Sequence, residues 1–236
     1  MNIVSCDPSI ISTSVVVNGK IFNYCRESAV YTKNGMSKWY RYADEFVNYR
    51  FIKINEFSSY SEGEITKIRD YDFITDLILQ DILDNIDPNE ETIFTSEGYN
   101  FASTAGDIID LVAFSTILRK KIYDRVTKNI LIVSPSTLKL ESCKLTYSPI
   151  VKESGKRIKK ITHEWRNSIG IPGGKFTKVD MCRSIIENES IDHPWYDHLK
   201  SIKDEILSFK DIKKPYEDVN DAIILYYIVK FGNLKP

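Results

Sequence analysis

Short apolar and β-branched runs separated by turn residues mark the start of this chain. They cover residues 2–6, 13–17 and 21–25. Asn18-Gly19, between the second and third runs, is typical of a two-residue hairpin turn. The pattern predicts an antiparallel hairpin with Asp7 at the end of its first strand.

Farther along, helical and extended patterns alternate. Apolar residues three to four apart predict a helix over 64–86, ended by Asp87-Pro88. Alternation of strands and helices after an antiparallel start indicates an α/β fold with a mixed sheet. The remaining predicted strands cover 92–96 and 130–133. Further helices are predicted over about 104–126, from Pro135 onward, over about 175–188, in a charged stretch that ends at 209, and from Asp218 onward. A long loop is predicted over 143–174.

Residues 38–57 carry seven aromatic side chains among charged residues and fit no regular period. Aromatic rings interleaved with Lys and Arg can stack on nucleic-acid bases. Packing against a flank of the sheet is the alternative, and we favour it.

The composition is that of a soluble domain. The chain has 236 residues, 42% of them hydrophobic, and a net charge of −1, which alone does not indicate a nucleic-acid binder. Its four cysteines show no paired spacing, which predicts free thiols in a reducing compartment and no zinc site. No apolar run reaches the ~18 residues of a membrane span, and no leader pattern precedes the first strand. We therefore expect a cytoplasmic protein.

Four acidic residues lie where elements begin or end. Asp7 and Glu97 follow short apolar strands, and central strands of α/β sheets end at the ligand crevice. Asp218 and Asp221 are three apart at the start of an otherwise apolar helix, so both project from one face. Each alone is also explained as a turn or cap residue. The set of four favours a carboxylate site.

Carboxylate oxygens are the ligands that Mg²⁺ and Mn²⁺ prefer. Two such ions about 3.5–4 Å apart can activate water and stabilise the leaving oxygen of a phosphodiester. The histidines do not compete for this role, because His193 and His198 are five apart, off one helical face, and His163 lies in a basic stretch.

Five segments, in order along nearly the whole chain, resemble the motifs of the RuvC-like Holliday junction resolvases, within the ribonuclease-H-like superfamily. That superfamily also has divergent bacteriophage members, which would place the protein in a bacterial or phage-infected cell. The segments are Ile3-Val4-Ser5-Cys6-Asp7-Pro8-Ser9, Thr95-Ser96-Glu97-Gly98, Ile132-Val133-Ser134-Pro135-Ser136-Thr137-Leu138-Lys139, Gly173-Gly174-Lys175-Phe176-Thr177-Lys178-Val179-Asp180-Met181 and Asp218-Val219-Asn220-Asp221-Ala222.

The resemblance implies a mixed five-stranded sheet with helices on both faces. It implies a homodimer that cuts branched DNA with two Mg²⁺ ions, for which Mn²⁺ can substitute. Asp7 would bridge both ions, Glu97, Asp218 and Asp221 would complete their ligands, and Lys178 would lie near the scissile phosphate. We expect one ribonuclease-H-like domain over residues 1–236, with a basic excursion at about 143–174 and an insertion at about 189–216.

Basic residues concentrate in the segment 139–183. Eleven basic and four acidic residues give it a net charge of +7, which leaves −8 for the rest of the chain. This asymmetry fits a local DNA-facing patch, with a solvated charged loop as the alternative. Trp165 within it either stacks at a branch point or packs internally. The predicted DNA contacts are Lys139, Lys144, Lys152, Lys156, Arg157, Lys159, Lys160, Arg166 and Lys175.

Three other classes compete with a junction nuclease. A nuclease of a phage packaging terminase would share the fold, but this chain has no Gly-x-x-x-x-Gly-Lys-Ser/Thr loop for an attached motor. A sugar-kinase or actin-like ATPase would need a second phosphate loop where Glu97 stands. A catalytically silent DNA-binding protein is the third, and the four acids argue against it. We hypothesise in-line hydrolysis that leaves a 5′-phosphate and a 3′-hydroxyl.

Overall fold

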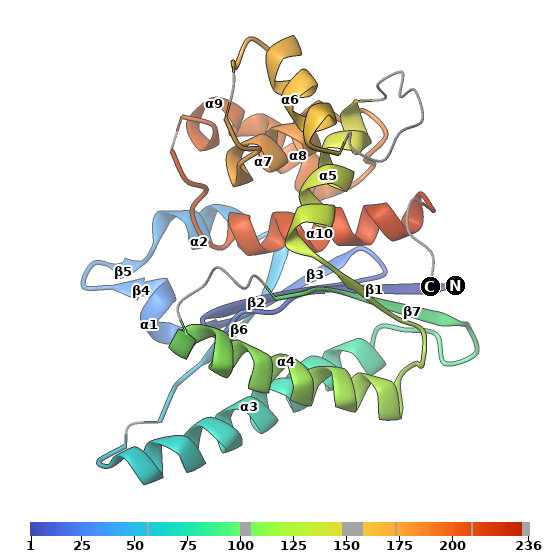
Figure 1. Ribbon diagram of the computed structural model, residues 1–236. Helices are drawn as coiled ribbons and strands as arrows, with labels where there is room; N and C mark the ends of the chain where they lie inside the picture. The colour runs from blue at the N-terminus through green and yellow to red at the C-terminus, as the bar shows by residue number, and fades with distance from the viewer. Residues whose placement is uncertain (56, 100–104, 148–157, 173, 209, 233–236) are drawn as a thin grey trace.

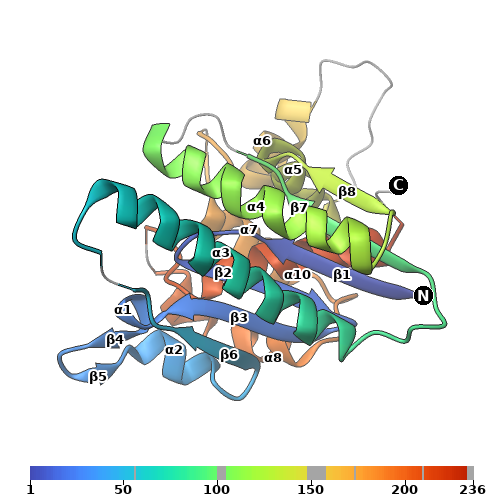
Figure 2. The same cartoon turned by 90° about the horizontal axis from the view of Figure 1, so that it is seen from below.

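A six-stranded mixed sheet with helices on both faces forms the centre of the molecule (Figures 1 and 2). The computed structural model describes residues 1–55, 57–99, 105–147, 158–172, 174–208 and 210–232, with the side chains of 105–107 and 158–160 excepted. The predicted α/β class, a mixed sheet with helices on both faces, is confirmed. The predicted count of five strands is wrong.

The strands are paired in both directions. Strand β2 is antiparallel to β1 and β3, whereas the pairs β1–β7, β7–β8 and β3–β6 are parallel. The hairpin and both later strands therefore match the sequence-based prediction. The order is β6-β3-β2-β1-β7-β8, formed by β1 Asn2–Asp7, β2 Ser12–Val17, β3 Lys20–Arg26, β6 Val47–Ile52, β7 Thr92–Glu97 and β8 Ile130–Val133.

The sixth strand, β6, comes from the aromatic stretch over 38–57, to which no element was assigned from the sequence. It extends the sheet beside β3, and its flanking region holds α1 Glu27–Val30, α2 Lys38–Ala43 and the short pair β4 Tyr31–Thr32 and β5 Gly35–Met36. Tyr40 is buried, and Tyr49 stacks tilted on it with ring centroids 5.5 Å apart. Packing against the sheet is thus confirmed for these rings, while Tyr42, Phe51 and Phe57 are exposed.

Two long helices, α3 Tyr60–Leu83 and α4 Ala105–Arg125, cover the lower face of the sheet in Figure 1. Ile78 and Phe114 on these helices share a core cluster with Val4 and Phe94 of the sheet. Helix α3 begins four residues before the predicted start because the Ser59 side chain accepts a hydrogen bond from the Glu62 N–H and caps it.

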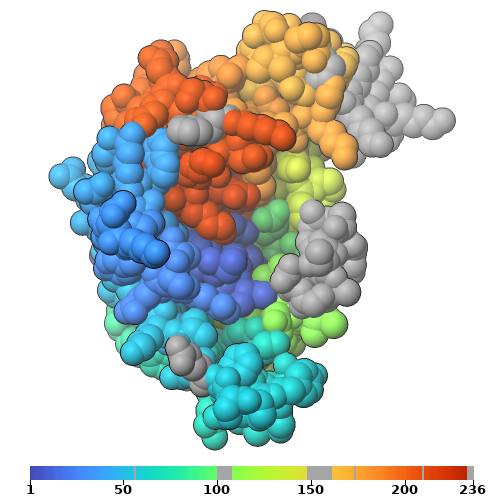
Figure 3. Space-filling model, turned by 90° about the vertical axis from the view of Figure 1, so that its left-hand side faces the viewer, coloured from blue at the N-terminus to red at the C-terminus, as the bar shows by residue number. Residues whose placement is uncertain are grey.

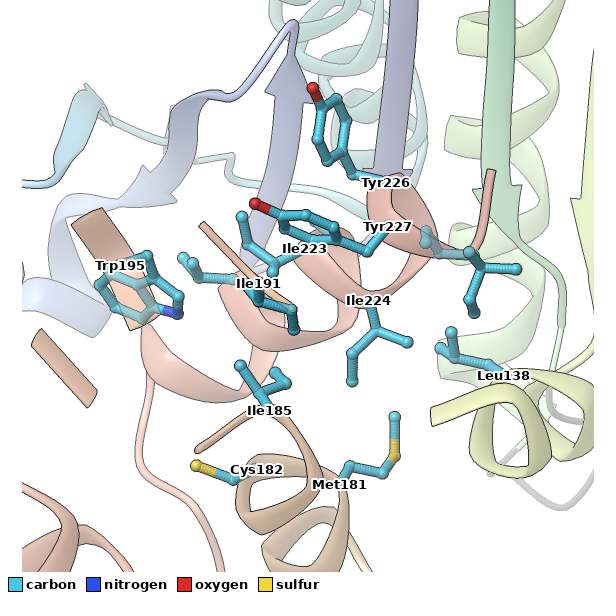
Figure 4. Packing of buried hydrophobic residues seen from close by; sticks show 14 of the residues in the cluster. Leu138, Met181, Cys182, Ile185, Ile191, Trp195, Ile223, Ile224, Tyr226 and Tyr227 are labelled. Atoms are coloured by element: carbon cyan, nitrogen blue, oxygen red, sulfur yellow. The ribbon is translucent and has the colours of Figure 1, made fainter. Parts of the chain in front are cut away.

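The upper face is covered by α10 Tyr216–Lys230, and a lobe of five helices lies above it (Figure 1). Nearly every side chain of α10 is buried, since the sheet packs on one side of it and helices α5 and α7 pack on the other (Figure 4). The lobe comprises α5 Pro135–Thr146, α6 Ile158–Ser168, α7 Lys178–Glu187, α8 Pro194–Ser201 and α9 Lys203–Ile206.

The prediction of a loop over 143–174 is wrong in two places. Helix α5 continues to Thr146, and α6 occupies 158–168. Within the described side chains of α6, Ile161 and Trp165 are buried on one face, and the residues around them are polar. Ile158, Ile161 and Trp165 are three and four residues apart, which is helical spacing, so the sequence does carry a signal for this helix. None of the helices in the described ranges is long and apolar enough to cross a membrane.

Candidate metal centre

The alternation of side chains along β1 directs Asp7 toward α10. Ile3 belongs to the core cluster on the α10 side, whereas Val4 and Cys6 belong to the cluster on the α3–α4 side. The Ser5 hydroxyl donates to the Ala222 carbonyl of α10 over 2.6 Å. Because successive side chains point to opposite faces of a sheet, Asp7 follows Ile3 and Ser5 to the upper face.

Strand β7 delivers Glu97 to the same place by the same rule. Ile93 packs on the α10 side and Phe94 on the opposite side, so Glu97 projects upward. The parallel register pairs Cys6 with Ser96, one residue before each acid. Asp7 and Glu97 therefore leave the sheet as neighbours.

Helix α10 brings the third carboxylate. Asp221 is 2% exposed, and its carboxylate lies with those of Asp7 and Glu97 so that one oxygen from each falls within 4.8 Å of the others. Asp218, also buried, is not part of this group of three. Three acids of the predicted set, Asp7, Glu97 and Asp221, are thus brought together, and Asp218 lies beside them.

The group of three carries a large electrostatic cost without a cation. Two ionised carboxylates 4.8 Å apart repel by about 3 kcal/mol at an effective dielectric constant of ~20. Burial, and then the charges of Glu97 and Asp221, raise the pKa of Asp7 well above its ordinary range. Burial likewise raises the pKa of Asp221 to about 7, although Lys178 acts in the opposite direction.

Two lysines offset part of the negative charge. The Lys178 ammonium donates to Asp221 Oδ2, and the Lys214 ammonium donates to both oxygens of Asp218, over 2.7 and 2.9 Å. Burial alone would lower the pKa of Lys178, but the carboxylates of Asp221, Glu97 and Asp7 raise it above its usual value. Lys178 at the start of α7 therefore stays charged beside the acids.

The donor set fits a hard divalent cation. It consists of three carboxylates, with no cysteine or histidine in the group, whereas zinc sites are built mainly from sulfur and nitrogen ligands. Mg²⁺ and Mn²⁺ prefer oxygen ligands. Asp7, Glu97 and Asp221 could hold such an ion from two strand ends and one helix.

The backbone around Glu97 is held from two sides. The Gly98 N–H donates to the Val133 carbonyl over 2.7 Å, and a Cβ at Gly98 would lie 3.3 Å from that carbonyl oxygen. On the other side, Arg119 of α4 donates to the Glu97 carbonyl over 2.9 Å and to the Tyr99 hydroxyl. These contacts fix the end of β7, and hence the direction of the Glu97 side chain.

The ends of β1 and β7 face the side of the molecule shown in Figure 3, where the dark-blue N-terminal strands are recessed below the red C-terminal segment. A separate cleft of about 500 Å³ borders the loop after Asp7, between Arg26 and the first turns of α3 and α4. It lies toward the helices of the lower face, whereas the three carboxylates face α10. The cleft and the carboxylate group are therefore distinct.

The predicted basic contacts are only partly available to DNA. Lys144 pairs with Glu141 over 2.7 Å, and Arg166 donates to the Lys175 carbonyl and lies 3.5 Å from Asp180. Lys139 is half-buried and Lys175 is exposed. Lys152, Lys156 and Arg157, together with the side chains of Lys159 and Lys160, lie outside the described residues.

Trp165 has a packing role. It is 2% exposed, and its ring lies edge-on to Phe176 with centroids 5.2 Å apart. The packing interpretation is confirmed, and stacking of this ring on a DNA branch point is wrong for this structure.

The histidines and cysteines behave as predicted. His193 Nδ1 accepts from the Trp195 N–H, so its Nε2 donates to the Gly19 carbonyl, and His198 Nε2 bonds to the Tyr216 hydroxyl. All four cysteines are buried free thiols. Neither residue type joins the carboxylate group.

Two charged neighbours of the site do not follow from the sequence pattern. Lys214 precedes α10, on the N-terminal side of the cis peptide bond to Pro215. Glu217 is half-buried, and burial, followed by the charge of Asp218, raises its pKa. For Lys214, the signal in the sequence is its position four residues before Asp218. That position predicts a contact only if the conformation of the turn before α10 is known.

Comparison with known proteins gives limited guidance. No protein-family model and no curated protein matches the chain. Among solved structures, the chain is similar to T. thermophilus RuvC in complex with a Holliday junction substrate, with a TM-score of 0.44 and 10% sequence identity over 100% of this chain and 99% of that one. The functional argument therefore depends on the site itself.

Proposed function

We propose that this chain is a divalent-metal-dependent endonuclease that hydrolyses phosphodiester bonds in branched DNA, with Holliday junctions as its substrate. The observation that carries the proposal is the convergence of Asp7, Glu97 and Asp221 at the end of two neighbouring strands, with the Lys178 ammonium beside them. A junction needs two symmetric cuts, so the proposal includes a homodimer with two such sites.

Each residue has a distinct part in this reaction. Asp7, Glu97 and Asp221 would hold Mg²⁺, which when bound would lower the pKa of water and stabilise charge on the phosphate and the leaving oxygen. Lys178 projects from the first turn of α7 and is positioned to bind a non-bridging phosphate oxygen once DNA competes with Asp221. Cleavage in line leaves a 5′-phosphate and a 3′-hydroxyl without a covalent enzyme intermediate.

Cleavage of labelled four-way junction, fork, flap and linear duplex DNA, with Mg²⁺ or EDTA, tests this proposal. We expect paired nicks in the junction only, abolished by EDTA. Asp7→Asn should cut about 10³-fold more slowly or worse, because a catalytic metal contributes several kcal/mol. Glu189→Gln removes an exposed acid and serves as the matched control.

The alternatives give different outcomes. Metal-dependent cutting of every substrate would favour a packaging or degradative nuclease. Tight junction binding without cutting would favour a silent DNA-binding protein. Full activity of Asp7→Asn would contradict the proposed site.

A further inference from the structure

Asp218 and Asp221 have the same sequence environment but different lysine contacts. Lys178 contacts one oxygen of Asp221, Oδ2, among the contacts that the structure describes. Lys214 contacts both oxygens of Asp218, over 2.7 and 2.9 Å. One oxygen of Asp221 is thus left to a metal ion, whereas the ammonium of Lys214 occupies the whole carboxylate of Asp218.

The carboxylate of Asp218 is shielded from solvent, whereas its partner Lys214 is partly exposed. The Asp218 side chain is 5% exposed and that of Lys214 is 35% exposed. Removing one partner from such a pair leaves an uncompensated charge in a poorly solvated place, which is strongly unfavourable. A cation that binds Asp218 must therefore first move the Lys214 ammonium away.

We infer that Lys214 is a cation built into the Asp218 side of the site, so that the chain without DNA binds one divalent ion, through Asp7, Glu97 and Asp221. A second ion that shares Asp218 enters only by displacing Lys214. This inference rests on the proposed function in that both require a divalent-cation site at these carboxylates. It goes further by assigning Lys214 a positioning role that determines how many ions are bound.

Titration of the full chain with Mn²⁺ by calorimetry, without DNA, tests the inference. We expect one ion per chain for the wild type and two for Lys214→Met, which keeps a long side chain but removes the charge. Lys213→Met, the exposed neighbour in the same turn, is the matched control and should bind one. Two ions on the wild type, or one on Lys214→Met with its fold intact by circular dichroism, would overturn the inference.

A second pair of variants covers the case in which Lys214→Met does not fold. Asp218→Asn should still bind one Mn²⁺ with an affinity within a few-fold of the wild type, whereas Asp221→Asn should lose more than tenfold. Loss of the ion in Asp218→Asn would overturn the inference.

These outcomes are separable from the nuclease proposal. One bound ion without any DNA cleavage would contradict the nuclease and leave the role of Lys214 intact. The absence of any Mn²⁺ binding to the wild type would contradict both.

Discussion

The upper face of the sheet and the helical lobe above it differ in how far their charged side chains are paired with opposite charges. Where β1, β7 and α10 meet, three carboxylates lie together and two lysines offset only part of their charge. In the lobe of α5–α9, by contrast, Lys144 has its own carboxylate partner, and Arg166 is held by the Lys175 carbonyl and by Asp180. The carboxylate group keeps an excess of negative charge, whereas Lys144 and Arg166 of the lobe are already compensated.

This difference shows why net charge alone is a poor guide to a binding surface. The segment 139–183 carries +7, yet part of that charge stabilises the lobe itself. An unpaired group of like charges is a stronger indication of a ligand, because its repulsion must be relieved by something that binds.

The largest effect is expected at Trp165, in the lobe. Trp165→Ala should lower the free energy of unfolding by about 3–5 kcal/mol, because a fully buried aromatic side chain is removed. Urea denaturation followed by circular dichroism measures this. Trp165→Phe should recover most of the stability and bind junctions as the wild type does. A stable Trp165→Ala that has lost junction binding would contradict the packing role.

Trp165 also illustrates what could be predicted from the sequence. The direction of the acids at the ends of β1 and β7 could be predicted from the sequence. Because side chains alternate along a strand with a period of two, the assignment of the apolar neighbours fixes the face to which Asp7 and Glu97 point. Helix α6 also carries a signal, because Ile158, Ile161 and Trp165 have helical spacing. Strand β6 carries one too, since apolar and polar residues alternate over 47–51. Its parallel pairing with β3 could not be predicted, because tertiary packing decides which strand it joins.

The different lysine partners of Asp218 and Asp221 could not be predicted from the sequence, for a different reason. Their spacing predicts a shared helical face, which is correct. Their partners depend on where Lys178 and Lys214 reach, and these lysines come from α7 and from the turn before α10. The contact between Lys178 and Asp221 joins segments 43 residues apart and is set by tertiary packing. Lys214 is four residues from Asp218, and its contact depends on the conformation of the turn before α10.

The stability of the metal-free protein should depend on pH through the acids. Asp7 and Asp221 have raised pKa values in the folded chain, so they hold protons more tightly there than in the unfolded chain. Their contribution to stability is fully present below the unfolded value of ~4 and is lost as the pH rises towards about 7, the pKa of Asp221.

Urea titrations between pH 4 and 8 in EDTA measure this effect. We expect the free energy of unfolding to fall by more than about 1.4 kcal/mol, the equivalent of one pKa unit. The fall should be smaller in Asp7→Asn and should be suppressed by Mg²⁺, which stabilises the ionised carboxylates. A stability that is independent of pH in EDTA, or unaffected by Mg²⁺, would contradict the account of the acids.

The smallest effect is expected at the exposed lysine of the lobe. Lys175→Gln should weaken junction binding a few-fold and reduce the slope of log affinity against log salt by about 1, because one phosphate contact is lost. Lys144→Gln should do less, since Glu141 already holds that ammonium. Fluorescence anisotropy at several salt concentrations compares the two. Equal losses would show that the internal pairing does not limit DNA contact.

Anomalous diffraction from crystals soaked in Mn²⁺ tests most directly whether the three carboxylates form a metal centre. The account predicts a peak bounded by Asp7, Glu97 and Asp221, about 2.1 Å from an oxygen of each, and no such peak in crystals of Asp221→Asn. A wild-type map without a peak there, or with its strongest peak away from all three acids, would contradict it.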